Sequence, residues 1–162
     1  MRFEEIQAMP KAWTLLSILP GLLLMFGALR EGVAEGVVPL PLVLLAVALT
    51  LIFGLWFRRL SLITEVDDTT VTLRYQGLLK TRTVPISTVR SARARTYRPL
   101  LEYGGWGIKF GPKGWVYNVS GKEGVQLELD GARPLLIGSR RADDLVEAIT
   151  LSPKYTGIGA GG

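Results

Sequence analysis

The stretch VVPLPLVLLAVALTLIFGLWF, residues 37–57, carries no charged side chain over its 21 residues. At a rise of about 1.5 Å per residue, a helix of this length reaches roughly 31 Å, the thickness of the hydrocarbon core of a bilayer. The run ends at Arg58 and Arg59, and the chain beyond them is rich in β-branched residues and turns. The sequence therefore predicts a transmembrane helix over residues 37–57 and a different kind of structure after it.

A second uncharged stretch, residues 12–29, precedes the first and contains Pro20-Gly21. Transmembrane helices tolerate such a kink where neighbouring groups satisfy the freed backbone. We interpret residues 12–29 as transmembrane helix 1 and residues 30–36 as a tight external turn. A cleaved signal peptide is one alternative, although the apolar run is long for it. A soluble core hairpin is another, although little chain is left to bury it.

Basic residues flank this hairpin unevenly. Arg2, Lys11, Arg58 and Arg59 lie at its two open ends, and Arg30 alone lies in the connector. Since Lys and Arg are retained on the cytoplasmic side, both termini are expected in the cytoplasm of a multi-pass cell-membrane protein. Lys11, Arg58 and Arg59 are interpreted as topology determinants.

Residues 1–11 are expected to form a polar cytoplasmic lead. Phe3, Ile6 and Met9 fall at roughly helical spacing there, which is compatible with a segment lying on the membrane surface.

Beyond residue 59 the hydrophobic period becomes two. Apolar residues alternate with others in four segments, TVTLRYQ (70–76), GWGIKF (105–110), WVYNV (115–119) and VQLELD (125–130). Such alternation is typical of strands with one buried face, and the turns between them include the hairpin dipeptide Asp130-Gly131. We predict a mainly-β domain, an antiparallel barrel or sandwich of about seven strands.

The end of the chain changes pattern once more. Leu145, Ala148 and Ile149 form an apolar stripe at helical spacing, which predicts one C-terminal helix that caps the β-structure. Residues 152–162 are rich in glycine and poor in apolar side chains, and we expect them to be disordered.

Several motifs together resemble a known family. They are Tyr97 and Pro99, YGGWGIKF (103–110), VYNVSGKEGVQLEL (116–129) and DGARPLLIGSRRADDLVEAI (130–149). They are similar to bacterial and archaeal membrane proteins that join a two-helix transmembrane hairpin to a C-terminal pleckstrin-homology-like domain. The resemblance implies that residues 60–151 form this domain, although Ala142 stands where a proline is expected to open the helix. The family has no assigned chemistry, so no activity is implied.

The distribution of charged residues narrows the range of possible partners. Residues 58–162 hold 16 Lys and Arg against 10 Asp and Glu, whereas residues 1–57 hold 3 against 4. A basic region beside a membrane span favours the anionic headgroups of the cytoplasmic leaflet as its partner over nucleic acid.

The search for catalytic chemistry is negative. The chain has no cysteine and no histidine, so disulfides, Cys-ligated metals and histidine-activated serines are excluded. A dinucleotide loop at Gly105-Trp106-Gly107 fails because Lys109 occupies the third glycine position between strands. We expect no enzyme, no cofactor and no metal.

The best binding candidates lie in VRSARARTYR, residues 89–98. Arg93, Arg95 and Tyr97 share one face of a strand and suit a phosphate or carboxylate. Lys80 and Arg82 join them if their strand pairs with this one. A solvated edge strand that its charges protect from aggregation is the competing interpretation.

Two functions remain open. In the first, the protein presents a cytoplasmic binding module to anionic lipid headgroups or to a protein partner. In the second, the transmembrane hairpin associates with a transporter or another membrane protein, and the soluble domain is regulatory.

Overall fold

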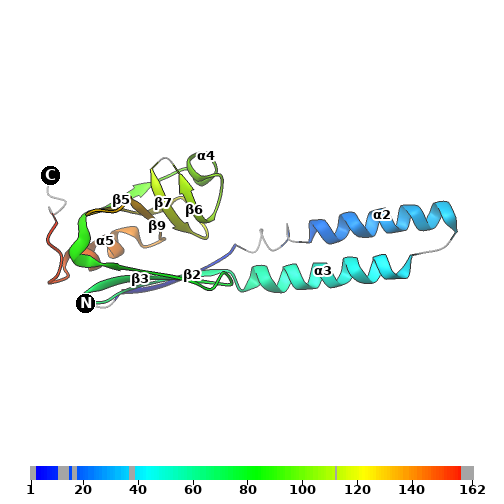
Figure 1. Ribbon diagram of the computed structural model, residues 1–162, viewed down its shortest axis with the longest axis horizontal. Helices are drawn as coiled ribbons and strands as arrows, with labels where there is room; N and C mark the ends of the chain where they lie inside the picture. The colour runs from blue at the N-terminus through cyan, green and yellow to red at the C-terminus, as the bar shows by residue number, and fades with distance from the viewer. Residues whose placement is uncertain (1–2, 11–14, 16–17, 37–38, 112, 158–162) are drawn as a thin grey trace. The chain divides into compact units, whose positions relative to one another are not determined.

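The computed structural model describes residues 3–10, 15, 18–36, 39–111 and 113–157. The chain divides into two compact units, one made of Met1–Ala8 with Ser61–Gly162 and the other of Met9–Leu60 (Figure 1). The first is the β unit and the second the helical unit.

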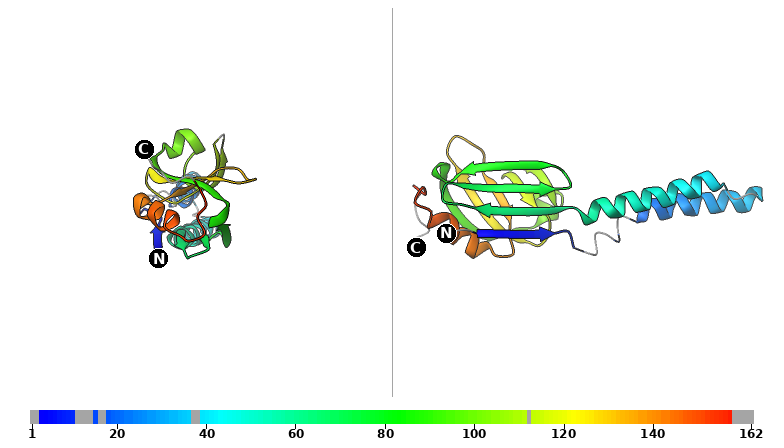
Figure 2. Two further views of the ribbon diagram at one scale, coloured as in Figure 1. Left: turned by 90° about the vertical axis from the view of Figure 1, so that its left-hand side faces the viewer. Right: turned by 90° about the horizontal axis from the view of Figure 1, so that it is seen from below.

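The β unit contains two sheets (Figure 2). Sheet A has the order β1-β2-β3-β4, and sheet B has the order β5-β8-β9-β7-β6. The strands of sheet A are β1 (Phe3–Ala8), β2 (Ser61–Val66), β3 (Thr70–Gln76) and β4 (Lys80–Pro85). Those of sheet B are β5 (Val89–Thr96), β6 (Gly107–Gly111), β7 (Gly114–Asn118), β8 (Glu123–Leu129) and β9 (Leu135–Gly138).

The mainly-β prediction is confirmed, but the closed barrel is wrong. In the described part of the chain β4 pairs with β3 and β5 with β8, and no ladder joins the two sheets. Pro85 lacks an amide donor, and the 3₁₀ turn at Ile86–Thr88 redirects the chain before β5 begins. Consecutive strands β4 and β5 therefore enter different sheets.

The core of the β unit is apolar and receives one helix. Leu62, Leu73, Leu127 and Ile137 are fully buried. Helix α5 (Ala142–Thr150) packs on β5 and β8 of sheet B and on β1 and β2 of sheet A. The predicted stripe of Leu145, Ala148 and Ile149 is its buried face, which confirms the C-terminal helix.

Strand β1 was not predicted. It pairs residue by residue with β2, from Phe3 opposite Val66 to Ala8 opposite Ser61. Its buried side chains are Phe3, Glu5 and Gln7, and its exposed ones include Ile6. The helical spacing assigned to residues 1–11 is wrong, because polar residues occupy two of the inward positions and hide the alternation.

Hydrogen bonds explain these buried polar groups. The Glu5 carboxylate accepts from Ser139 Oγ at 2.5 Å and from the Arg140 backbone N–H at 2.9 Å. Gln7 Nε2 donates to Gly138 O at 2.7 Å. Strand β1 is thus bonded by its backbone to sheet A and by its side chains to the segment that follows β9.

The hairpin at Asp130-Gly131 is confirmed, but its loop is longer than the two residues predicted. The loop runs from residue 130 to 134, and β9 then pairs antiparallel with β8 and parallel with β7. Pro134 has no N–H to donate, and its carbonyl instead accepts from Trp115 N at 2.9 Å. The connection therefore lengthens, and β9 inserts between β8 and β7.

Two short segments complete the β unit. Helix α4 (Pro99–Tyr103) follows β5, where the sequence indicated only a proline near a strand end. Ser152, in the segment expected to be disordered, donates from Oγ to Asp68 O at 2.8 Å. Residues 158–162 lie outside the described residues.

The helical unit contains α2 (Leu19–Glu35) and α3 (Leu40–Arg58), which pack against each other. Helix α2 continues through most of residues 30–36, the predicted turn, and ends at Gly36, whose φ of 70° suits a glycine C-cap. Among the described helices, α3 has the length and apolar character to cross a bilayer. Helix α2 contains Arg30, Glu31 and Glu35, and the structure does not show the predicted two-helix transmembrane hairpin.

Small residues line the contact between α2 and α3, and large apolar residues face outward. Gly21, Ala28 and Ala46 are buried, whereas Leu23 and Phe26 are 71% and 70% exposed. Close approach through small residues with apolar side chains outside is typical of helices packed in lipid. The exposed surface of the helical unit is therefore apolar on both helices, and α3 is the candidate span.

We expect Gly21→Val to separate α2 from α3. A Cβ at Gly21 would overlap Thr50 Oγ1 and lie 2.9 Å from Ala46 O, whereas a Cβ at Gly27 of the same helix meets nothing within 4 Å. Overpacking of this kind costs about 1–3 kcal/mol. Gly27→Val is the matched control, since it carries the same change in helix propensity.

The measurement uses a fluorescent pair attached through cysteines introduced at Leu19 and Leu55, which lie far along the two helices from their connector and are 48% and 61% exposed. The chain has no cysteine of its own. Energy transfer in micelles should be lost at a lower SDS fraction in Gly21→Val than in Gly27→Val. Equal SDS midpoints would refute the small-residue contact.

We expect Glu5→Ala to loosen β1, because it removes an acceptor from two buried hydrogen bonds. Bonds to a charged group are worth about 2 kcal/mol each. Hydrogen exchange of the β1 amides in the full chain should accelerate at least tenfold. Glu4→Ala, an exposed neighbour on the opposite face, should leave the exchange rate within about twofold. Similar exchange in both variants would contradict this role for Glu5.

Candidate anion-binding site

Strand β5 carries the arginines singled out in the sequence. Ala92 is buried at 1% exposure, and Arg93 and Ala94 are exposed. Since side chains alternate along a strand, Arg93, Arg95 and the following Tyr97 lie toward one face of sheet B, and Ala92 and Ala94 toward the other. We refer to the arginine side as the outer face, because α5 packs on β5 at the other.

Helix α4 supplies the counter-charge on the outer face. Glu102 Oε2 accepts from Arg95 Nη2 at 3.0 Å and from Lys113 Nζ at 3.3 Å. Its other oxygen accepts from the Arg98 backbone N–H at 2.8 Å. That backbone bond, followed by the Arg95 guanidinium, holds the pKa of Glu102 below its ordinary value. Glu102 is therefore ionised at neutral pH and fixes the position of Arg95.

The outer face contains a hollow of about 350 Å³. Its lining residues are Arg93, Arg95, Lys113, Gln126, Glu128 and Pro134. We call it the outer hollow.

Two polar atoms of the outer hollow have no partner in the described structure. Gln126 is 7% exposed, and its Oε1 accepts no hydrogen bond. Arg95 Nε is buried and donates none. Leaving such groups unsatisfied costs about 1–3 kcal/mol. Both residues line the outer hollow, so a ligand bound there lies next to these two groups.

Arg93 differs from its neighbour in being exposed and in making no ion pair among the described residues. It pairs through the backbone with Gln126 of β8. Its charge is therefore available at the mouth of the outer hollow.

Tyr97 lies beneath this site and does not line it. Its ring is 1% exposed and packs edge-on against Tyr103 at a centroid distance of 6.2 Å. Its hydroxyl accepts from Asn118 Nδ2 at 2.9 Å, and burial raises its pKa. The described structure gives this phenol a structural partner and no exposed surface.

The expected association of Lys80 and Arg82 with Arg93 and Arg95 is wrong. Lys80 and Arg82 lie on β4 of sheet A, which pairs with β3 and not with β5. Arg82 instead has its guanidinium carbon 5.8 Å from the centre of the Tyr117 ring.

The expected topology determinants are only partly described. Arg58 is the last residue of α3 and Arg59 its C-cap, and both are exposed. Lys11 lies outside the described residues.

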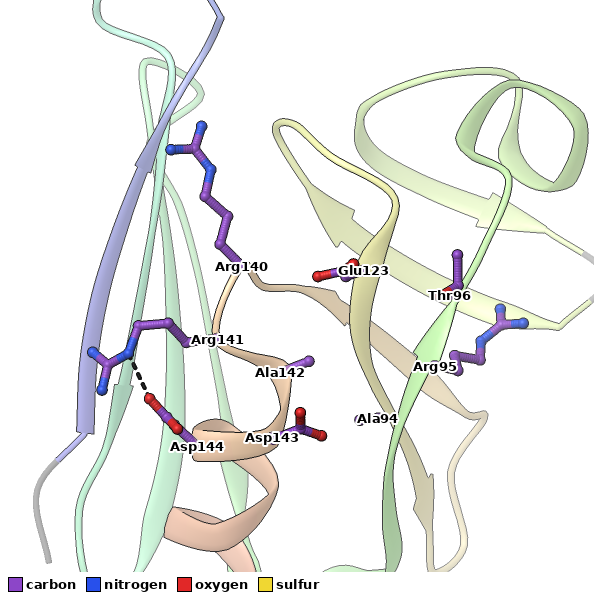
Figure 3. A pocket seen from close by; sticks show the side chains of 9 residues that line it. All are labelled: Ala94, Arg95, Thr96, Glu123, Arg140, Arg141, Ala142, Asp143 and Asp144. Carbon is purple, nitrogen blue, oxygen red and sulfur yellow. Dashed lines mark hydrogen bonds and ion pairs between the residues drawn. The ribbon is translucent and has the colours of Figure 1, made fainter.

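A second hollow, of about 540 Å³, opens beside β5 (Figure 3). Ala94 and Thr96 of β5 lie across it from Ala142 and Asp143 at the start of α5. Arg141 Nε donates to Asp144 Oδ2 at 2.7 Å. We call it the edge hollow.

Sequence reasoning missed four residues that line the outer hollow, namely Lys113, Gln126, Glu128 and Pro134, and the counter-charge Glu102 on α4. Gln126 and Glu128 had a local signal, since they alternate with the apolar Val125, Leu127 and Leu129 and therefore share the face opposite the core.

Comparison with known proteins adds no assignment. No protein-family model and no curated protein matches this chain. Among the described residues, no group of three or more acidic side chains is placed to hold a metal ion.

Proposed function

We propose that the protein is a membrane-anchored binding module, whose β unit takes an anionic lipid headgroup in the outer hollow. The observation that carries the proposal is the cationic lining of the outer hollow, Arg93, Arg95 and Lys113, next to the unsatisfied Arg95 Nε and Gln126 Oε1. A phosphodiester with a hydroxyl-bearing headgroup matches them, because it supplies an anionic oxygen and a donor.

The pairing of β1 with β2 supports two crossings of the membrane. The strands precede and follow the helical unit and share one sheet, so they lie on the same side of any bilayer. If α3 crosses it, the chain between Ala8 and Leu40 crosses as well. The basic residues at the open ends of the two helices favour the cytoplasm for both termini.

Resemblance to pleckstrin-homology-like domains is part of this proposal. Two sheets with a C-terminal helix packed against both are compatible with that architecture. The proposed site does not depend on it.

A soluble version of the β unit must include β1. Met9 N donates to Leu60 O at 3.1 Å, so Asn-Gly in place of residues 10–59 can join β1 to β2 as a two-residue hairpin. We call this the spanless chain and expect it to unfold cooperatively in urea. A fragment that begins at Leu60 would leave Ser139 and the Arg140 amide without Glu5.

We expect the spanless chain to float with liposomes containing phosphatidylglycerol and not with phosphatidylcholine alone. Arg93→Glu should reduce the bound fraction at least tenfold, because one reversed charge at the mouth of the hollow repels the phosphate. Lys80→Glu makes the same charge change on sheet A and should reduce binding by no more than about twofold.

Gln126→Leu separates headgroup recognition from charge. It should abolish the preference for phosphatidylglycerol over phosphatidic acid, which carries no headgroup hydroxyl, while binding to anionic liposomes persists. Equal losses in Arg93→Glu and Lys80→Glu would indicate diffuse attraction and would refute the site. No flotation on any liposome would refute the lipid ligand and direct attention to a protein partner.

A further inference from the structure

One edge of sheet B has unpaired backbone groups, and these groups take no part in the proposed headgroup site. Strand β5 is an edge strand, bonded to β8 on one side. Tyr97 N donates to Lys122 O at 2.8 Å, which sets the alternation along the ladder. Residues 93 and 95 therefore direct their backbone groups toward β8, and Ala94 and Thr96 direct theirs away from the sheet.

The fold covers only the first half of this edge. Ala92 is buried, and α5 packs on β5. Before Ala92, the C-terminal segment covers the edge: Thr156 Oγ1 lies 3.4 Å from Ser87 O, and the backbone of Gly157 packs against the carbonyl of Arg90. Edge strands are normally protected by such cover, by bulges or by proline.

The second half has no such cover, bulge or proline, and its remaining protection is the charge of Arg93 and Arg95. The register shift of β5 is at Val89 and Ser91, and the small, exposed Ala94 and Thr96 follow it. Among the described residues, no backbone group bonds to the outward N–H or C=O of either one. Both residues line the edge hollow of about 540 Å³ (Figure 3). Unpaired donors and acceptors beside free volume are complementary to one kind of ligand, an extended backbone.

The arginines of β5 indicate which kind of strand can be added to this edge. On the outer face, a strand added to β5 would place alternate side chains beside Arg93 and Arg95. A second copy of this chain paired through β5 would bring arginine against arginine. A segment with acidic residues at alternate positions would instead place a carboxylate beside the exposed Arg93.

We propose that the Ala94–Thr96 edge of β5 binds an extended acidic segment of a partner protein by strand addition. The outward N–H and C=O of Ala94 and Thr96 supply the backbone bonds, and Arg93 pairs with an acidic side chain. On the opposite face, apolar side chains of the segment enter the edge hollow near Ala142. This interaction goes beyond the proposed headgroup binding and depends on different atoms, except that Arg93 serves both.

The probe is a fluorescein-labelled, blocked peptide of sequence Thr-Glu-Val-Glu-Val-Glu-Thr, added to the full chain in neutral detergent micelles. Its anisotropy should rise with protein concentration, whereas the same peptide with lysine in place of glutamate should bind at least tenfold more weakly. Equal binding of the two peptides would overturn the proposed acidic partner.

Two variants of Thr96 test the backbone bonds, because one of them lacks the outward N–H and the other keeps it. Thr96→Pro removes an outward N–H without removing a bond to β8, a position at which edge strands accept proline. It should weaken peptide binding by about tenfold, the effect of one lost hydrogen bond. Thr96→Val retains the N–H and should bind within about twofold of the parent. Equal affinities of the two variants would overturn strand addition.

Peptide methylation keeps the test valid if Thr96→Pro misfolds. Of two peptides N-methylated on alternate sets of amides, one should lose binding and the other retain it, because one edge of the peptide faces β5. Retention in both would overturn the proposal. So would a dimer of the full chain that Thr96→Pro dissociates, since it would assign the edge to a second copy.

Flotation and peptide binding test the two proposals independently of each other. Thr96→Pro in the spanless chain should leave flotation on phosphatidylglycerol liposomes unchanged while peptide binding falls. Flotation without any peptide binding would eliminate the strand-addition site alone.

Discussion

The pairing of β1 with β2 is the constraint on which the rest of the structure depends. Six residues from the start of the chain are bonded to six residues that follow the helical unit. The intervening residues must therefore leave the β unit and return to it. Glu5 and Gln7 then connect this strand to the β9–α5 segment, so the first strand binds both sheets.

This constraint links the two halves of the molecule. The helical unit buries small side chains and exposes large apolar ones, the reverse of a soluble protein, whereas the β unit buries Leu62, Leu73 and Ile137 completely. The exposed surface of the helical unit is therefore apolar, whereas the β unit keeps its apolar side chains in a core. The helical unit is an insertion between two paired strands, so the chain leaves the β unit once and returns to it once.

The elements that were predicted correctly from the sequence are those with a regular spacing of apolar residues. The apolar run of α3, the alternation in β3 and β8, and the stripe on α5 were each visible because one class of side chain repeats at a fixed interval. Strand β1 was missed because Glu5 and Gln7 stand at inward positions and form hydrogen bonds to groups more than 130 residues away in the chain. Such pairing has no local signal.

The candidate site was predicted in part for a similar reason. The shared face of Arg93 and Arg95 follows from strand geometry, which is local. That Lys80 and Arg82 belong to another sheet, and that Glu102 and Gln126 complete the site, depends on strand order, which periodicity does not determine. The absence of cysteine and histidine limited the chemistry to charge and hydrogen bonding.

The most direct test is the sidedness of single cysteines in the full chain, which has none of its own. Cysteines introduced at Glu4 in β1, at Gly36 between α2 and α3, and at Lys80 in β4 would be labelled with an impermeant maleimide in sealed membrane vesicles. The account predicts that Glu4 and Lys80 are labelled from one side and Gly36 from the other. Labelling of Glu4 and Lys80 from opposite sides, or of all three from the same side, would contradict it.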